Sequence, residues 1–196
     1  MKRFLPLLPF LLAGLALAAA QRLPGVAAPE NYKLCFTPDL DKATFDGDET
    51  ISMRVLKPTK EITLNAADID FHAVITSGGS TQMANVTPDK EREMAVLSIE
   101  KPLSAGPATI HITYSDTLNN EMRGLYLSTD DQGRKYVATQ FEATDARRAF
   151  PSFDEPPFTF DITAIADKGR VQAQQLALCG TARLVGAFAI GPQASP

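Results

Sequence analysis

Short runs in which apolar and polar residues alternate fill the chain between residues 31 and 165. Every second residue is apolar in 50–55 and 109–114, and this period of two is typical of a strand with one buried face. The runs interpreted as strands are residues 32–36, 50–55, 61–64, 69–75, 94–99, 109–114, 125–127, 135–142 and 160–164. Turn-forming clusters separate them at residues 46–48, 77–80, 104–107 and 130–133. No long run has the helical period of 3.6, so the pattern predicts an all-β fold, an antiparallel sandwich or barrel.

The densest run of charges, aromatic rings and prolines is residues 139–157, which read T-Q-F-E-A-T-D-A-R-R-A-F-P-S-F-D-E-P-P. Thr144 is expected to cap a short helical turn near residues 144–149. The turn ends at Phe150, because the residue before a proline is disfavoured in the helical conformation. The run is therefore predicted to form a strand end, a turn and a rigid corner.

Both ends of the chain differ from its β-rich middle. Residues 1–20 combine a charged start, an apolar run and three alanines, which is typical of a signal peptide, with an uncleaved anchor as the alternative. The apolar run is shorter than the ~20 residues that a spanning helix needs, so no stable membrane span is expected. We therefore expect a secreted or periplasmic protein with one domain at residues 21–168. Residues 169–196, rich in Ala, Gln and Gly, predict an irregular or partly helical tail.

Composition and charge narrow the possible chemistry. With a net charge of −4 and no run of Lys or Arg, the chain is not expected to bind nucleic acid. His111 lies on the polar face of a predicted strand and is interpreted as a surface side chain, and His72, on the face of Asp70 and Val74, is likewise not expected to bind a ligand. Cys35 and Cys179 are allowed to pair outside the cytosol, although we favour an unpaired, buried thiol for Cys35. Neither cysteine has a neighbouring histidine or a C-x-x-C partner, which disfavours nucleophile and zinc-ligand roles.

Gln140 and Glu142 are the candidate binding residues. They stand two apart on a predicted strand, so their side chains point the same way. A carboxylate beside an amide suits recognition of an ammonium group, because both accept hydrogen bonds and the carboxylate adds charge. The alternative is a surface ion pair between Glu142 and Arg147 or Arg148, and spacing alone favours that alternative.

Residues 139–156 resemble the N-terminal domain signature of the aminopeptidase N family of zinc metallopeptidases, T-Q-x-E-x-x-D-A-R-x-x-F-P-C-F-D-E-P. Shorter pieces that also match the family are R-L-P at 22–24, P-x-x-Y-x-L at 29–34, F-D-G at 45–47, G-L-Y at 124–126 and F-D-I at 160–162. Ser152 stands where the family mostly has cysteine. The resemblance implies a saddle-shaped antiparallel β-sandwich for residues 21–168.

The resemblance also implies roles for the two candidate residues. Gln140 would line the pocket for the first side chain of a substrate, and Glu142 would bind the free α-amino group of a peptide N-terminus. The family's zinc is held by an H-E-x-x-H motif and a downstream glutamate, and this sequence contains neither that motif nor the G-x-M-E-N motif. We therefore predict no catalytic residue, no metal ligand and no cofactor in this chain, zinc belonging to the full-length family.

Two functions are compatible with these observations. The first is the N-terminal substrate-recognition part of a secreted zinc aminopeptidase, whose partner is a missing catalytic domain of the same protein. The loss of resemblance near Lys168 and the unrelated tail favour it. The second is a freestanding, non-catalytic β-sandwich that binds peptides or another protein.

Overall fold

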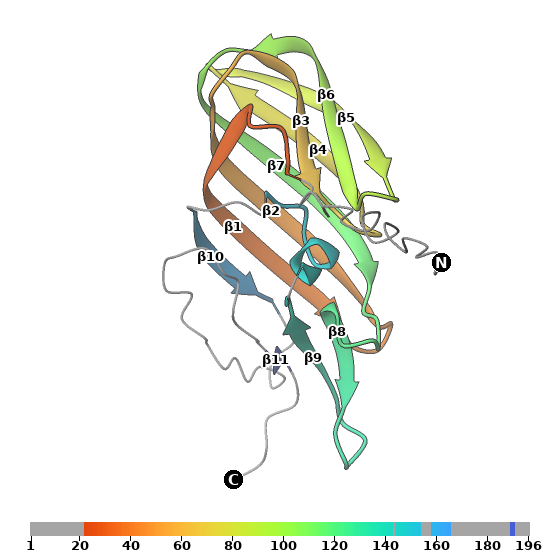
Figure 1. Ribbon diagram of the computed structural model, residues 1–196. Coiled ribbons are helices and arrows are strands. Elements are labelled where there is room, and N and C mark those ends of the chain that lie inside the picture. Colours follow the sequence, from red (N-terminus) through yellow and green to blue (C-terminus); the bar gives the residue numbers. More distant parts are fainter. Residues whose placement is uncertain (1–21, 143, 154–157, 166–188, 191–196) are drawn as a thin grey trace, which may run out of the picture.

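The computed structural model describes residues 22–142, 144–153, 158–165 and 189–190, and this part of the chain has the predicted all-β fold. Its strands are β1 (Ala27–Asp39), β2 (Thr44–Val55), β3 (Thr59–Asn65), β4 (Asp70–Ser77), β5 (Ser80–Asp89), β6 (Met94–Leu103), β7 (Gly106–Thr117), β8 (Gly124–Thr129), β9 (Lys135–Gln140), β10 (Thr159–Ala164) and β11 (Ala189–Ile190), and its 3-10 helix η1 is Asp145–Arg148 (Figure 1). No helix in these residues has the length and apolar character needed to cross a membrane.

The strands form a large sheet and a small one. The large sheet has the order β10-β1-β2-β7-β4-β5-β6-β3, and the small sheet has the order β11-β9-β8 (Figure 1). Neighbouring strands are antiparallel except β10, which runs parallel to β1 from Asn31↔Thr159 to Phe36↔Ala164. The predicted antiparallel arrangement therefore holds except at this edge. β1 ends at Asp39 and β10 begins at Thr159, so no tight hairpin joins the two strands and forces the antiparallel direction.

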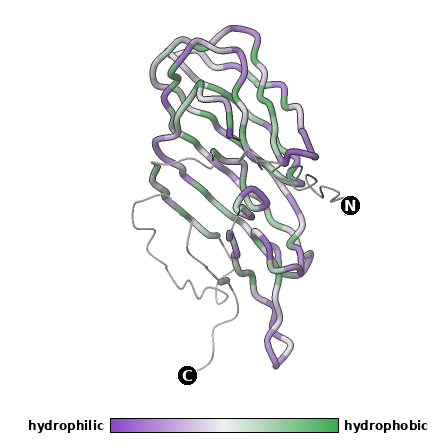
Figure 2. The backbone as a smooth tube through the Cα atoms, in the orientation of Figure 1, coloured by the Kyte–Doolittle hydropathy of each residue, from purple (hydrophilic) through white to green (hydrophobic). Residues whose placement is uncertain are grey.

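The alternation along the strands sets which side chains enter the core. In β7, Ile110, Ile112 and Tyr114 are buried, whereas His111 and Thr113 are exposed. Strands with this pattern alternate between hydrophobic and hydrophilic residues along the backbone tube (Figure 2). The buried faces of both sheets contribute to one hydrophobic cluster. The period of two in the sequence thus predicted the inward and outward faces of these strands.

Gly47 lies inside β2, so the prediction of a turn at residues 46–48 is wrong. Its register partner on β7 is Tyr114, whose ring fills the space where a side chain at position 47 would stand. A Cβ atom there would come 2.1 Å from Cζ of Tyr114. Glycine is required here by the close approach of a ring, which is one of the reasons for a glycine in a strand interior.

β5 is a strand that the alternation did not predict. Its burial is irregular, and Met83 in its middle is 76% exposed, so the sequence shows no consistent apolar face. The turn before it was predicted. Gly78 and Gly79 have positive φ values of 57° and 77°, and a two-residue hairpin between β4 and β5 favours glycine at both places.

Two residues of the tail belong to the small sheet. Ala189 and Ile190 pair with Ala138 and Val137 of β9, on the opposite side from β8. The prediction of an irregular or partly helical tail is wrong at these two residues, because the open edge of β9 offers main-chain groups that a local sequence pattern does not reveal. The predicted signal peptide, Cys179 and the other residues from 169 onward lie outside the described residues.

Candidate functional site

The two candidate binding residues lie where β9 ends and the chain turns, and this corner is formed by the described residues 140–142 and 144–153. β9 ends at Gln140, so Glu142 lies just beyond the strand and not on it as predicted. Phe141 between them is buried, whereas Gln140 and Glu142 are both exposed. The alternation therefore continues past the last paired residue, and both polar side chains remain on the solvent side.

The short turn that follows is closed by main-chain hydrogen bonds. The N–H groups of Ala149 and Phe150 both donate to the carbonyl of Ala146, at 2.9 and 3.1 Å. Thr144 makes no side-chain hydrogen bond to the turn, so the prediction that it acts as a cap is wrong. Its φ and ψ of −139° and 7° lie outside the β region that a capping residue usually adopts.

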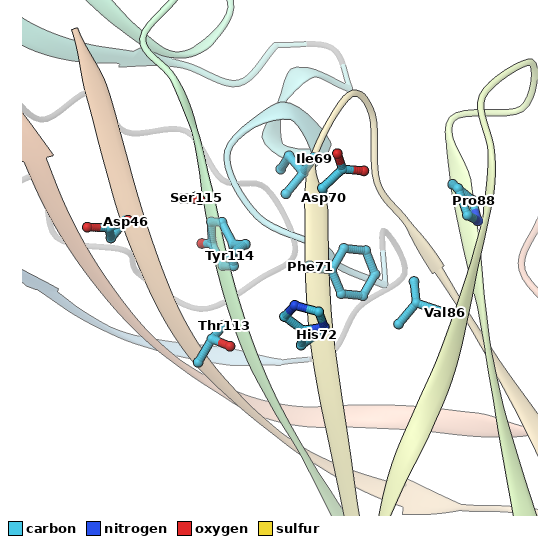
Figure 3. Close-up of a pocket in the computed structure, with 10 residues that line it drawn as sticks. All are labelled: Asp46, Ile69, Asp70, Phe71, His72, Val86, Pro88, Thr113, Tyr114 and Ser115. Carbon is cyan, nitrogen blue, oxygen red and sulfur yellow. The ribbon is translucent and has the colours of Figure 1, made fainter. Parts of the chain in front are cut away.

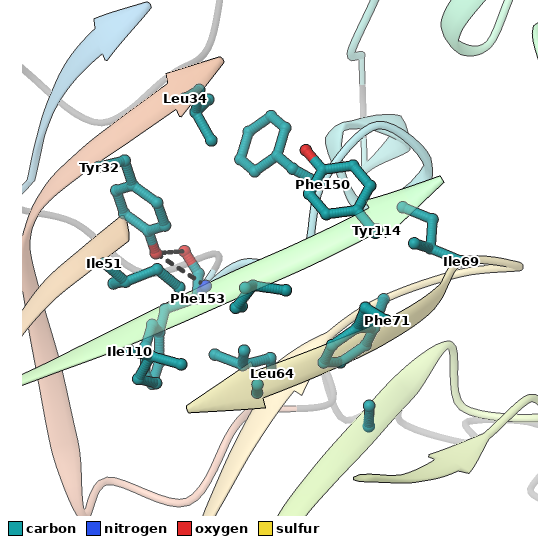
Figure 4. Close-up of a cluster of buried hydrophobic side chains, with 14 of the residues drawn as sticks. Tyr32, Leu34, Ile51, Leu64, Ile69, Phe71, Ile110, Tyr114, Phe150 and Phe153 are labelled. Carbon is teal, nitrogen blue, oxygen red and sulfur yellow. Dashed lines mark hydrogen bonds between the residues drawn. The ribbon is translucent and has the colours of Figure 1, made fainter. Parts of the chain in front are cut away.

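Phe150 fixes the corner to the core. Its side chain is fully buried, and its ring centroid lies 6.3 Å from that of Tyr32 and 6.0 Å from that of Phe141. The hydroxyl of Tyr32 in turn accepts a hydrogen bond of 2.9 Å from the N–H of Phe153 (Figure 4). Aromatic contacts of this kind add to the free energy gained by burial. The corner is therefore anchored to the hydrophobic core by several aromatic rings.

Main-chain hydrogen bonds hold the same corner from the side. Asn65 and Ser152 exchange two of them, with N···O distances of 2.7 and 2.9 Å, and the N–H of Ala67 donates to the carbonyl of Arg147 at 2.9 Å. Ser152 is only 4% exposed. These bonds join the corner to the end of β3, so the segment that carries Gln140 and Glu142 rests on rigid elements on two sides.

A network of ion pairs covers the outside of the turn. Arg148 contacts Asp68 through Nη1 at 2.7 Å, Asp145 through Nε at 3.2 Å, and Glu93 through Nη2. Arg147 contacts the other oxygen of Glu93, with an Nη1···Oε2 distance of 3.2 Å. The arginine side chains are 14% and 22% exposed, so solvent screens this network less than an ordinary surface pair.

Replacing Arg148 with methionine should lower the free energy of unfolding by about 1 kcal/mol, because Asp68, Glu93 and Asp145 would then face one another without their shared cation. Urea denaturation at low ionic strength measures the change. Arg92→Met is the matched control, because Arg92 is 65% exposed and lies 3.7 Å from its partner Asp89. Equal losses in the two variants would contradict a special role for Arg148.

The other sequence candidates lie away from this corner. His111 is exposed as predicted, and its Nε2 lies 2.9 Å from Oδ2 of Asp48; His72 is exposed on β4. Cys35 is half-buried on β1, and burial followed by the charge of Asp48 raises the pKa of its thiol. Within the described residues, no three His, Cys, Asp or Glu side chains converge to hold a metal ion, so this part of the chain does not fit a zinc site.

Glu49 is an unusual residue that sequence reasoning missed. It faces the core from β2 and is 0% exposed, and neither carboxylate oxygen has a hydrogen-bond partner among the described residues. Burial raises the pKa of Glu49 well above its ordinary value, and the charge of Asp48 raises it further. The position of Glu49 in the alternating series Phe45, Gly47, Glu49 and Ile51 could have indicated that it is buried. The prediction of a turn at residues 46–48 interrupted this series.

A comparison with known protein families agrees with the all-β fold and with the motif at residues 139–156. Residues 28–178 match the family described as Peptidase M1 N-terminal domain. The chain belongs to this family. The family match extends to residue 178, ten residues beyond Lys168, near which the motif resemblance in the sequence ends.

Named aminopeptidases are among its relatives. Aminopeptidase M1-C of Oryza sativa subsp. japonica is 37% identical over 140 residues, which are 70% of this chain and 16% of that protein. Aminopeptidase N of Acetobacter pasteurianus is 32% identical over 188 residues, 90% of this chain and 52% of that protein. Puromycin-sensitive aminopeptidase of Caenorhabditis elegans is 35% identical over 153 residues, 73% of this chain and 16% of that protein. The chain thus spans a minor part of the first and third of these relatives and 52% of the second.

Proposed function

We propose that this chain acts as the substrate-recognition domain of a secreted zinc aminopeptidase. In this proposal Glu142 binds the free α-amino group of a peptide, and Gln140 lines the pocket for its first side chain. The observation that carries it is the exposure of both residues on a corner whose neighbours Phe150 and Ser152 are buried and bonded to the core. The signal peptide at residues 1–20 is part of the same proposal.

The chemistry of the two side chains supports this role. A carboxylate forms a charge-assisted hydrogen bond with the ammonium group of a peptide N-terminus, whereas an internal peptide bond has no such charge. A site with this acceptor therefore discriminates in favour of chain ends. The rigid support of the corner favours binding, because less conformational freedom is lost when the substrate docks.

Zinc enters the proposal through the rest of an aminopeptidase. In this proposal the ion would be held by residues of a catalytic domain, where it would polarise the peptide carbonyl and activate water. Within the described residues no three His, Cys, Asp or Glu side chains converge to hold a metal ion. The part played by this chain is to bind and orient the N-terminal end of the substrate. That task depends on Glu142 and on the position of the corner.

Replacing Glu142 with glutamine should weaken binding of a peptide with a free N-terminus about tenfold, because a charge-assisted hydrogen bond contributes more than a neutral one. Binding of a short peptide to the purified chain, followed by NMR titration, measures the change. The same peptide with an acetylated N-terminus should bind wild-type protein as weakly as the free peptide binds the variant.

Glu100→Gln is the matched control for this experiment, because Glu100 is an exposed glutamate on β6. It should leave the affinity for both peptides unchanged. Equal affinity of the wild-type chain for the free and the acetylated peptide would overturn the role of Glu142. That result would instead favour a non-catalytic peptide-binding module.

A further inference from the structure

A cleft of about 640 Å³ opens where the large sheet splits between β4 and β5 (Figure 3). β4 pairs with β7 from Asp70 to Ser77, but with β5 only from Ala73 onward. From Asn85 to its end, β5 pairs with β6 instead. Residues 70–72 therefore have no strand partner on the β5 side within the described part of the chain. Main-chain groups on an open strand edge are available to a further strand.

The inner wall of the cleft is apolar. Phe71 of β4 and Val86 and Pro88 of β5 face the space between the two strands (Figure 3), and Ile69 lies just before β4. Val86 packs against the core cluster but is only partly buried. An apolar side chain of a ligand would complete this surface. A cavity of this size is within the range of ligand sites in proteins.

The outer rim of the cleft is acidic. Asp46 and Asp70 flank Ser115 in one row across β2, β7 and β4, and both aspartates are exposed. None of the ten lining residues is Lys or Arg. The rim thus concentrates negative charge that a cationic ligand would neutralise.

We propose that this cleft binds a basic peptide segment in an extended conformation, added as a strand to the open edge of residues 70–72. Strand addition uses main-chain hydrogen bonds for affinity and alternate side chains for specificity. The acidic rim selects positive charge, because the potentials of the two partners must be complementary. Neither Gln140 nor Glu142 lines the cleft, so this site does not depend on the function proposed above.

The pleat of the sheet predicts the pattern of the bound segment. Phe71 points inward and is buried, whereas Asp70 and His72 on either side are exposed. Cross-strand neighbours share a face, so the ligand residue opposite Phe71 points into the apolar cleft and the residues beside it point toward the acidic rim. The expected sequence is basic–apolar–basic.

The test uses a fluorescent peptide with a central Lys-Leu-Lys, acetylated at its N-terminus and amidated at its C-terminus. Fluorescence anisotropy should show saturable binding to the whole chain, and a Glu-Leu-Glu peptide should not bind. The double variant Asp46→Asn, Asp70→Asn should bind Lys-Leu-Lys about tenfold more weakly, since it removes the two negative charges that line the cleft. The double variant Glu100→Gln, Glu121→Gln, which loses the same charge at other exposed positions, should bind as the wild type does.

N-methylation of the peptide tests the strand geometry. In an extended strand, alternate N–H groups face the same neighbour, so either the leucine N–H or the two lysine N–H groups face β4. One of the two methylated peptides, with the methyl group at leucine or at both lysines, should therefore bind about tenfold more weakly, and the other should keep its affinity. The proposal would be overturned if the two methylated peptides bound equally well, or if the Glu-Leu-Glu peptide bound. It would also be overturned if the two double variants had equal effects on binding. Competition by lysine amide as strong as by the peptide would also overturn it in favour of a simple amine site. Because the peptide has no free α-amino group, these results are independent of Glu142.

Discussion

Replacing Phe150 with alanine should lower the free energy of unfolding by about 3–5 kcal/mol, the range found when a large aromatic side chain is removed from a packed core. The side chain of Phe150 is 0% exposed. Its ring lies 6.3 Å from that of Phe36 and 6.1 Å from that of Phe160, in addition to its contacts with Tyr32 and Phe141. The cavity would open beneath the corner that carries Glu142.

Chemical denaturation followed by circular dichroism measures this effect. Phe158→Ala is the matched control, because Phe158 is only half-buried although its ring lies 5.2 Å from that of Tyr32. Its removal should cost clearly less than that of Phe150. A loss below about 1 kcal/mol for Phe150→Ala would show that the corner is not fixed by this ring.

Replacing Glu49 with methionine should raise the free energy of unfolding by about 2 kcal/mol at mildly alkaline pH. A buried charge without a partner is unfavourable, and replacing buried ionic groups with apolar side chains of similar shape is often stabilising. The neighbours of Glu49 in the sheet offer no cation: Leu34 on β1 and Ile112 on β7 are its register partners, and Asp48 precedes it on β2. Burial, followed by the charge of Glu49, raises the pKa of Tyr114 well above its ordinary value.

The pH dependence of the Glu49 effect has a definite sign. The pKa of Glu49 is raised in the folded state, so the folded chain keeps a proton that the unfolded chain has already lost. Stability of the wild type therefore falls as the pH rises from the ordinary glutamate pKa, about 4.3, to the raised pKa of the folded state. The gain from Glu49→Met should grow over this window, and below it only the smaller gain from removing a buried neutral polar group should remain.

Denaturation curves at a series of pH values separate charge from packing. Glu49→Gln cannot ionise but keeps a buried polar group, so it should remove the pH dependence with less gain in stability than methionine. Glu100→Gln, at an exposed position, should preserve the pH dependence of the wild type. If Glu49→Gln shows the same decline with pH as the wild type, Glu49 is not the group responsible.

The local pattern of the sequence was enough to predict most strands and the corner. Alternation assigns the buried face of β7, and Gly78 and Gly79 mark the hairpin between β4 and β5, because both signals act over a few neighbouring residues. The strand end and the turn within residues 139–153 were predicted for the same reason, whereas residues 154–157 of the predicted corner lie outside the described residues. The exposure of Gln140 and Glu142 followed from the same alternation, although the strand ends before Glu142.

Long-range contacts decided what local signals did not. Gly47 looked like a turn residue, but the ring of Tyr114, far away in sequence, makes glycine necessary in the middle of β2. The same misreading hid Glu49, whose burial depends on the strands on either side of it. The cleft beside β4 exists because β5 leaves one neighbour for another halfway along its length. Strand faces are determined by residues next to one another, whereas partners and cavities are determined by segments that meet only in the folded chain.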